Sequence, residues 1–246
     1  MFLKRHGENL LAELRARLPE RLPRKLGVAV SGGGDSVALM HLLHQVAQNE
    51  EITLFVATVD HGLRPGAAQE AVTVSRPAAA LGLPHDILHW AGWDGAGNVQ
   101  DEARKARYSL LAGWAQQRGI EAIALGHTAD DQAETLLMRL GRSSGVTGLS
   151  GMSASRQREG VTLLRPMLGI TRKDLRTYLT GIGATWVEDP SNQDPRFDRI
   201  KAREAVSGLK PLGIDALSLS RVADNLAQAH AALGVFAQES AGKVAQ

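Results

Sequence analysis

The chain has 246 residues and no cysteine. That absence excludes disulfide bonds, thiolate nucleophiles, thiolate-ligated Fe–S clusters and persulfide sulfur carriers, so sulfur-inserting chemistry is disfavoured. No apolar run reaches the roughly 18 residues that a membrane-spanning helix needs. Met1 to Leu22 read as a charged amphipathic helix without the apolar core of a signal peptide. These absences predict a soluble, cytoplasmic protein with no membrane partner.

Apolar runs of β-type residues alternate with helical patterns along most of the chain. Strands are predicted at 26–30, 52–59, 85–90 and 121–125, and helices at 36–48, 68–82, 98–118 and 130–141. The alternation is typical of repeated βαβ units, so the predicted fold class is α/β, a doubly wound parallel sheet. Ligands bind beyond the carboxyl ends of such strands, where the polar motifs of this chain fall.

Composition predicts one main domain, because 43% apolar residues in a chain of this length supply a full α/β core. Pro77 interrupts the third helical pattern and predicts a kink there, or a helix that ends near Ser75. Residues 142–158 are rich in Gly, Ser and Arg and predict a mobile loop, followed by a shorter βαβ-like stretch over 161–187. An alanine-rich amphipathic helix is predicted beyond Lys210.

A glycine-rich turn, Ser31-Gly32-Gly33-Gly34-Asp35-Ser36, joins the first predicted strand to a helix. Glycines let the backbone approach an anion, and a helix N-terminus offers unpaired N–H groups. The spacings of a Walker A loop and of a dinucleotide fingerprint are both missing. Asp35 would repel bound phosphates unless a cation such as Mg²⁺ lay between them. The turn therefore predicts a pyrophosphate site with a metal at Asp35; the alternative is an ordinary βα turn.

Two further motifs follow predicted strands. Asp60 and His61 open a loop after the second strand that could cap an adenosine, or that forms a plain turn with local hydrogen bonds. Gly126 and His127 follow the fourth strand.

The helix after His127 carries three carboxylates, Asp130, Asp131 and Glu134, which repel one another at i,i+3 and i,i+4 spacing. A cation, either Mg²⁺ or an amine substrate, would relieve that repulsion. Helix capping explains one or two of these acids, but not all three with the histidine.

Basic residues gather in two places. Arg104 and Arg107 lie three apart on one predicted helix, a spacing that suits a polyanion or, equally, the neighbouring Asp101 and Glu102. The second group, which is Arg196, Arg199, Lys201 and Arg203, is either an RNA contact or a solvated helix face. The formal net charge of +2 permits an RNA partner without requiring one.

The turn Ser-Gly-Gly-x-Asp-Ser resembles the PP-loop of the N-type ATP pyrophosphatases, adenine nucleotide alpha hydrolase-like enzymes that cleave ATP between its α and β phosphates. Taken together, the motifs resemble the tRNA(Ile)-lysidine synthetase family over most of residues 25–205. The other matching blocks are Val59 to Arg64, Asn98 to Tyr108, Gly126 to Thr135, Arg165 to Leu168 and Trp186 to Asn192.

The resemblance implies that ATP, Mg²⁺ and L-lysine are used to convert the wobble cytidine of the CAU-anticodon tRNA(Ile) into lysidine, through an adenylated cytidine. Asp131 and Glu134 would bind lysine, and His127 or Asp130 would assist proton removal. The implied catalytic set is Asp35, His127, Asp130, Asp131, Glu134, Arg107 and Arg199. The implied nucleotide-binding set is Ser31, Gly32, Gly33, Gly34, Asp35, Ser36, Asp60, His61 and Gly126.

The resemblance also suggests an organisation and its alternatives. Residues 1–210 would form the PP-loop catalytic domain, and 211–246 a helical extension that starts a missing or reduced tRNA-binding region. The oligomeric state is open, with a homodimer as one option. Alternatives are a PP-loop ligase acting on a small acid or amide, similar to argininosuccinate or NAD synthetases, and a non-catalytic adenine-nucleotide-binding module.

Overall fold

The computed structural model describes residues 2–62, 67–91, 98–188 and 198–244 and divides into two compact units. The first unit comprises Met1–His127 and Ala154–Asp189, and the second comprises Thr128–Ser153 and Pro190–Gln246. The first unit holds the β-sheet, whereas the second is helical. Each is described by itself below.

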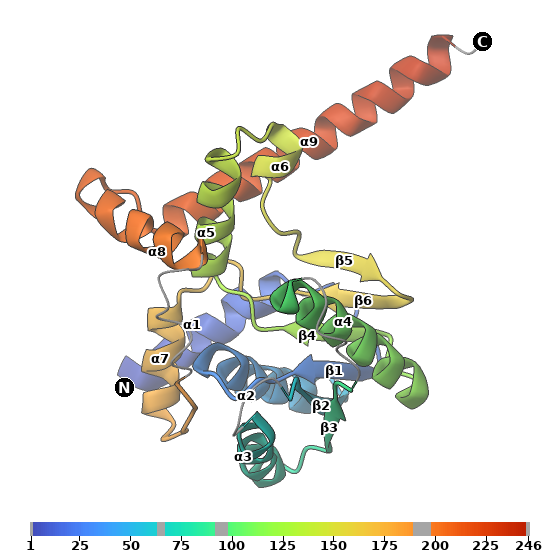
Figure 1. Cartoon of the computed structure of the whole chain (residues 1–246), viewed down its shortest axis with the longest axis vertical. Coiled ribbons are helices and arrows are strands. Elements are labelled where there is room, and N and C mark those ends of the chain that lie inside the picture. Colours follow the sequence, from blue (N-terminus) through green and yellow to red (C-terminus); the bar gives the residue numbers. More distant parts are fainter. Residues whose placement is uncertain (1, 63–66, 92–97, 189–197, 245–246) are drawn as a thin grey trace. The chain divides into compact units, whose positions relative to one another are not determined.

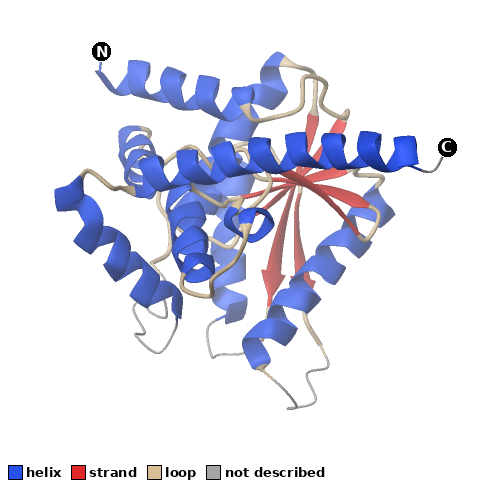
Figure 2. Cartoon of the chain, turned by 90° about the horizontal axis from the view of Figure 1, so that it is seen from above, coloured by secondary structure: helices blue, strands red, loops and turns tan. Residues whose placement is uncertain are grey.

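Six strands of the first unit form one sheet in the order β3-β2-β1-β4-β6-β5 (Figure 1). The strands are β1 Lys25–Ala29, β2 Thr53–Asp60, β3 His85–His89, β4 Ala122–Leu125, β5 Ser155–Arg158 and β6 Val161–Leu164. All pairings are parallel except that of β5 with β6, which is antiparallel. In Figure 2 the strands fan out, as the usual twist of a sheet requires. The predicted parallel α/β sheet is confirmed, with an antiparallel edge strand that the sequence did not predict.

Helices cover both faces of this sheet. The helices of the first unit are α1 Phe2–Ala16, α2 Gly34–Asn49, α3 Ala67–Ala80, α4 Val99–Arg118 and α7 Arg172–Gly181. The larger core joins α1, α2, α3 and α7 to one face, through residues such as Leu26 and Val28 of β1. The second core joins α4 to the opposite face, through Ile123 and Leu125 of β4. This two-sided cover confirms the predicted doubly wound arrangement, because alternate strand residues point to opposite faces.

Close packing against α4 explains one glycine of β1. A Cβ added to Gly27 would lie 2.8 Å from the ring of Trp114. The Trp114 indole N–H donates to Asp86 Oδ2 at 2.8 Å, and Arg118 donates to Asp86 Oδ1 at 2.6 Å. These bonds hold the indole against the strand, so any side chain at position 27 would have to displace it.

Two local predictions need correction. Helix α3 continues through Pro77 to Ala80, so the alternative that it ends near Ser75 is wrong. Proline removes only one backbone donor here, and buried Val74 and Ala78 pack the helix into the core on both sides of Ser75. Residues 142–158 are not the predicted mobile loop, since they include α6 Val146–Leu149 and strand β5.

The second unit is built around α5 Ala129–Leu140. It packs against α8 Asp198–Leu209 and α9 Ala216–Val244, with the short 3₁₀ helix η2 Lys210–Leu212 between them. A small core of Ala133, Val206 and Ala216 fills this contact. In the described part of the chain, no helix is long and apolar enough to span a membrane.

His85 bridges β2 and α3 inside the first unit. The Thr58 hydroxyl donates to the Val30 carbonyl at 2.8 Å, so it accepts the N–H of His85 Nε2, also at 2.8 Å. The Ser75 hydroxyl lies 2.9 Å from His85 Nδ1 and, when the imidazole is neutral with its proton on Nε2, donates to that nitrogen. Burial lowers the pKa of His85, although the Asp86 carboxylate opposes the shift.

We expect the first unit to lose stability in mild acid. Burial is the main cause that lowers the pKa of His41, His61 and His85 from the ordinary value of 6.5. The unfolded chain therefore binds protons before the folded chain does, and the free energy of unfolding falls as pH decreases below that value. Urea denaturation at about pH 7.5 and about pH 5.5 measures the difference.

A matched pair of histidine variants checks the cause. His41→Gln should weaken the pH dependence of the free energy of unfolding, whereas His230→Gln, at an exposed position of α9, should leave it unchanged. An equal or greater stability of the unaltered chain at about pH 5.5 contradicts the expectation.

Candidate functional site

The glycine-rich turn lies where predicted, between the carboxyl end of β1 and the N-terminus of α2 (Figure 1). Gly32 has a φ of 89°, a conformation that favours glycine. Gly33 is the N-cap of α2, and no side chain caps the helix there. The N–H groups in the first turn of an α-helix lack intrahelical acceptors, and such groups bind phosphate in other helices.

The two serines of the turn have different roles in the structure. Ser36 Oγ donates to the Gly33 carbonyl at 2.9 Å and accepts the Ser31 N–H at 3.1 Å. The Ser31 hydroxyl lies 3.2 Å from Ser36 Oγ. Ser36 is 7% exposed, whereas Ser31 is exposed. Ser36 therefore braces the turn internally, and Ser31 is the serine whose hydroxyl can reach a ligand.

Helix α7 supplies two arginines to this turn. Arg172 Nε lies 3.2 Å from Asp35 Oδ2, and both side chains are only about one-fifth exposed, at 21% and 22%. A Cβ added to Gly34 would lie 2.7 Å from Arg176 Nε. Arg176 therefore lies against the backbone at Gly34, and a side chain at position 34 would displace its guanidinium group.

The segment after α7 is also joined to the turn. Val187 N donates to the Gly32 carbonyl at 2.9 Å, and Val187 forms a parallel bridge with Gly33. Glu188 accepts a bond of 2.6 Å from Arg176 and one of 3.1 Å from the Trp186 indole. The part of the Trp186 block that is described therefore contacts the turn through Val187, and Glu188 bonds to Arg176 beside it. Its remainder, Asp189 to Asn192, lies outside the described residues, as do Arg196, Leu63 and Arg64.

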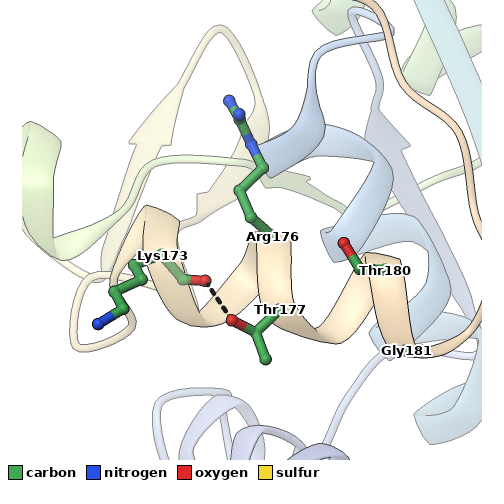
Figure 3. Close-up of a pocket in the computed structure, with 5 residues that line it drawn as sticks. All are labelled: Lys173, Arg176, Thr177, Thr180 and Gly181. Atoms are coloured by element: carbon green, nitrogen blue, oxygen red, sulfur yellow. Dashed lines mark hydrogen bonds between the residues drawn. The ribbon is translucent and has the colours of Figure 1, made fainter.

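A surface hollow of about 520 Å³ runs along α7 (Figure 3). Its lining residues are Lys173, Arg176, Thr177, Thr180 and Gly181. Thr177 Oγ1 donates to the Lys173 carbonyl at 3.0 Å, so that hydroxyl is already used inside the helix. The lining contains none of the residues that the sequence predicted for the site.

Asp60 and His61 follow β2 at the same edge of the sheet. Asp60 is 8% exposed; its Oδ1 accepts the Gly62 N–H at 2.9 Å, and its Oδ2 lies 3.3 Å from His89 Nδ1. The bond to Gly62 is a local bond of a turn, whereas the contact with His89 joins β2 to the neighbouring strand β3. His61 packs edge-on against Trp90 with 6.0 Å between ring centres. Burial and the charge of Arg107 lower the pKa of His61, against the effect of Asp60.

Gly126 brings the end of β4 against the turn. A Cβ added there would lie 3.1 Å from Ser36 Cα and 3.2 Å from Ser36 N. Both atoms are backbone and cannot move aside cheaply, so position 126 requires glycine. His127, half-buried, comes next and donates its backbone N–H to Leu125.

The three predicted acids lie on α5 in the second unit. Asp131 Oδ2 accepts the Thr128 backbone N–H at 2.8 Å and the Thr128 hydroxyl at 2.9 Å, completing a capping box. Capping therefore accounts for one oxygen of Asp131. Asp130 is half-buried beside it.

Glu134 is the most buried of these acids, at 1% exposed. Arg203 of α8 donates to its Oε1 at 3.0 Å. A buried carboxylate is costly unless a cation compensates it, and Arg203 does so here. The basic group that contains Arg203 is thus only partly a solvated face, whereas Arg199 is exposed at the start of α8.

The site residues fit a metal ion that is coordinated by both protein and phosphate better than one that is coordinated by protein alone. Among the described residues, no group of three His, Asp or Glu could hold an ion. Mg²⁺ commonly takes one or two carboxylates together with phosphate oxygens, so Asp35 beside the uncapped end of α2 suffices.

The sequence did not predict the arginines that contact Asp35, Gly34 and Glu134. Arg172, Arg176 and Arg203 belong to ordinary amphipathic helices, and nothing in their spacing points to Asp35, Gly34 or Glu134. Arg165 was noted only as part of a family block. The separations of 137 residues between Arg172 and Asp35, and of 69 between Arg203 and Glu134, explain why local patterns could not find them.

A family model described as a PP-loop domain matches residues 5–209. The chain belongs to the PP-loop family. Its PP-loop is therefore the turn from Ser31 to Ser36, which agrees with the geometry at the N-terminus of α2.

Curated relatives within this family carry the name tRNA(Ile)-lysidine synthase. The relative from Ruegeria pomeroyi is 58% identical over 233 residues, which cover 95% of this chain and 56% of the relative. The one from Rhodopseudomonas palustris is 48% identical, covering 84% of this chain and 60% of the relative. The one from Methylobacterium nodulans is 41% identical, covering 94% and 70%. The chain thus groups with the lysidine synthases, and spans little more than half the length of the first of these relatives.

Solved structures share the fold at low sequence identity. A U34-tRNA thiolase from Methanococcus maripaludis has a TM-score of 0.78 at 15% identity and covers 91% of this chain and 79% of that one. An NMN synthetase from Francisella tularensis has a TM-score of 0.55 at 11% identity, covering 91% and 93%. These likenesses confirm the fold alone.

Proposed function

We propose that this chain carries out the ATP-dependent formation of lysidine at the wobble cytidine of the CAU-anticodon tRNA(Ile). The observation that carries the proposal is the PP-loop at the uncapped N-terminus of α2, in a chain 58% identical to a curated tRNA(Ile)-lysidine synthase. The reaction takes place where its tRNA substrate is, in the cytoplasm. Residues 1–210 act as the catalytic domain, and 211–246 begin a helical extension.

The first step transfers AMP to the base. The C2 carbonyl oxygen of cytosine attacks the α-phosphorus of ATP, the bond to the β-phosphate breaks, and pyrophosphate leaves. The N–H groups at the start of α2 and the Ser31 hydroxyl hold the departing pyrophosphate, while Ser36 keeps the loop in shape. Asp35 would hold Mg²⁺, which would supply positive charge to the departing phosphates. For Asp35 to take this role, its contact with Arg172 must loosen.

Other residues of the first unit surround this step. Gly126 lets β4 approach the loop, and Asp60 with His61 shapes the turn that would contact adenosine. Arg107 contributes positive charge at the same edge of the sheet, as its effect on His61 indicates.

The second step replaces AMP by lysine. The ε-amine attacks C2, the C2–O bond to the adenylate breaks, AMP leaves, and a proton is lost from the amine nitrogen. Asp131 and Glu134 bind the ε-ammonium group of lysine before the attack, and His127 or Asp130 takes from it the proton whose loss gives the attacking amine. Arg203 occupies Oε1 of the buried Glu134 carboxylate until a ligand ammonium group competes for it. Exposed Arg199 contacts RNA.

The direct test is mass analysis of transcribed tRNA(Ile) after incubation with the chain, ATP, Mg²⁺ and lysine. The expected result is a gain equal to lysine minus water at the wobble base. Leaving out lysine should instead yield an AMP adduct on the RNA. A tRNA that gains neither group contradicts the proposal.

The two alternatives give different results in the same assay. A PP-loop ligase that acts on a small acid or amide would release pyrophosphate at the same rate without RNA. A non-catalytic nucleotide-binding module would bind ATP and form no AMP with any substrate. Size measurement in solution tests separately whether the chain forms a homodimer.

A further inference from the structure

Four arginines surround one buried tyrosine in the first unit. Tyr108, in the middle of α4, is 3% exposed. The guanidinium carbon of Arg158 lies 4.3 Å from the ring centre, that of Arg104 5.4 Å and that of Arg107 5.6 Å. Arg165, itself 6% exposed, is close enough to act on the tyrosine electrostatically. We call these five residues the arginine–tyrosine cluster.

The cluster is assembled from three separate elements. Arg104 and Arg107 come from α4, Arg158 from the edge strand β5, and Arg165 directly follows β6. Arg158 pairs in register with Val161, and Val161 belongs to the core beneath α4. Directly opposed residues of antiparallel strands share a face, so Arg158 points to the α4 side. Arg156, opposite Leu163, shares that face and adds an exposed arginine beside the cluster.

The charge of the cluster is strongly positive. Burial raises the pKa of Tyr108, yet the charges of Arg104, Arg107 and Arg165 outweigh it and hold the pKa below its ordinary value. Glu159 lies 3.1 Å from Arg158 and pairs with it. Arg107 extends the positive field to His61, at the edge of the sheet that carries the PP-loop.

We propose that the arginine–tyrosine cluster binds backbone phosphate groups of the RNA substrate. This inference rests on the proposed function. Guanidinium groups match phosphate oxygens with two parallel hydrogen bonds, and stacking on a fixed ring holds them ready at a low entropic cost. Arg104 is exposed and the Arg158 side chain is 35% exposed, so both can reach a ligand, while buried Arg165 supplies fixed charge behind them.

A simpler role explains only part of the cluster. Arginines on the edge strand β5 would discourage pairing with a strand of another chain. That role accounts for Arg156 and Arg158, but it requires neither arginine of α4. It also requires no buried arginine behind the ring.

The test measures binding of transcribed tRNA(Ile) by the full chain over a range of salt concentrations. The variants are Arg104→Ala and Arg158→Ala. Lys105→Ala is the matched control, because Lys105 is a neighbouring exposed cation of α4 that pairs with Glu102 at 2.7 Å. Arg158→Lys keeps the positive charge but removes the planar guanidinium group that can form two parallel hydrogen bonds with a phosphate. ATP affinity is measured for every variant.

Each alanine variant is expected to weaken tRNA binding about three- to fivefold at moderate salt and to lower the salt slope by about 0.7 to 0.9. Arg158→Lys should keep the slope and lose part of the affinity, and ATP affinity should not change. The proposal is overturned if Arg104→Ala and Arg158→Ala have the same tRNA affinity and salt slope as Lys105→Ala. It is also overturned if these variants lose only ATP or pyrophosphate affinity, which would indicate a free phosphate ligand.

The outcomes separate this inference from the proposed function. If the unaltered chain makes lysidine and the arginine variants bind tRNA normally, only the cluster proposal fails. If the variants lose tRNA affinity but the unaltered chain makes no lysidine, the proposed function fails and the phosphate site stands. An unaltered chain that binds no RNA overturns the cluster proposal as well.

Discussion

Replacement of Asp35 by alanine is expected to lower AMP formation by about 10²- to 10³-fold, because the carboxylate that would hold Mg²⁺ against the leaving pyrophosphate is removed. Pyrophosphate release with tRNA(Ile), ATP and lysine is the measurement. The reduction should appear in kcat more than in the KM for ATP, since the N–H groups at the start of α2 are intact.

The contact of Asp35 with Arg172 makes controls necessary. Asp35→Ala leaves the Arg172 guanidinium without this carboxylate, so part of any effect could come from a displaced arginine. Arg172→Gln removes the ion pair and keeps Asp35. If Asp35 acts through metal and phosphate, Arg172→Gln should lose far less activity than Asp35→Ala. Equal losses would show that the ion pair itself is what matters. Glu121→Ala, at an exposed position before β4, should keep full activity.

The Glu134→Gln variant is expected to slow lysine transfer strongly while it still adenylates tRNA. Glutamine keeps an oxygen that can accept the bond from Arg203, but it lacks the charge that an ammonium group needs. The adenylated tRNA should accumulate in the presence of lysine, and the KM for lysine should rise by at least about tenfold, the effect of roughly 1.4 kcal/mol of lost binding. Mass analysis of the tRNA distinguishes the AMP adduct from lysidine.

Arg203→Gln separates binding from structural support. If Glu134 only stabilises the helices through its ion pair, both variants should share one defect in stability and activity. If Glu134 binds lysine, Arg203→Gln should lower stability without raising the KM for lysine, because Arg203 no longer competes with the lysine ammonium group for the Glu134 carboxylate.

Asp131→Asn separates lysine binding from helix capping in the same way, since asparagine can still accept hydrogen bonds from Thr128 in the capping box. A loss of lysine affinity in that variant then reports charge and not helix capping.

Much of the fold could be predicted because its rules are local. The first four parallel strands and the helices after them follow from hydrophobic periodicity, and the structure places them within a few residues of the predicted bounds. The PP-loop was also predictable, since its glycines, serines and aspartate are contiguous along the chain. The edge strand β5, Ser155–Arg158, was not, because three of its four residues are exposed and it shows no apolar alternation.

The sequence by itself determined a parallel α/β fold and a phosphate-binding turn, since both depend on residues that are adjacent along the chain. Only the tertiary structure decided which side chains meet across the chain: Arg172 with Asp35, Arg203 with Glu134, and the arginines around Tyr108. These pairings depend on how helices pack on a sheet and on one another. Periodicity determines which face of a helix is buried, but the partner of a charged residue on that face depends on packing between elements far apart in sequence.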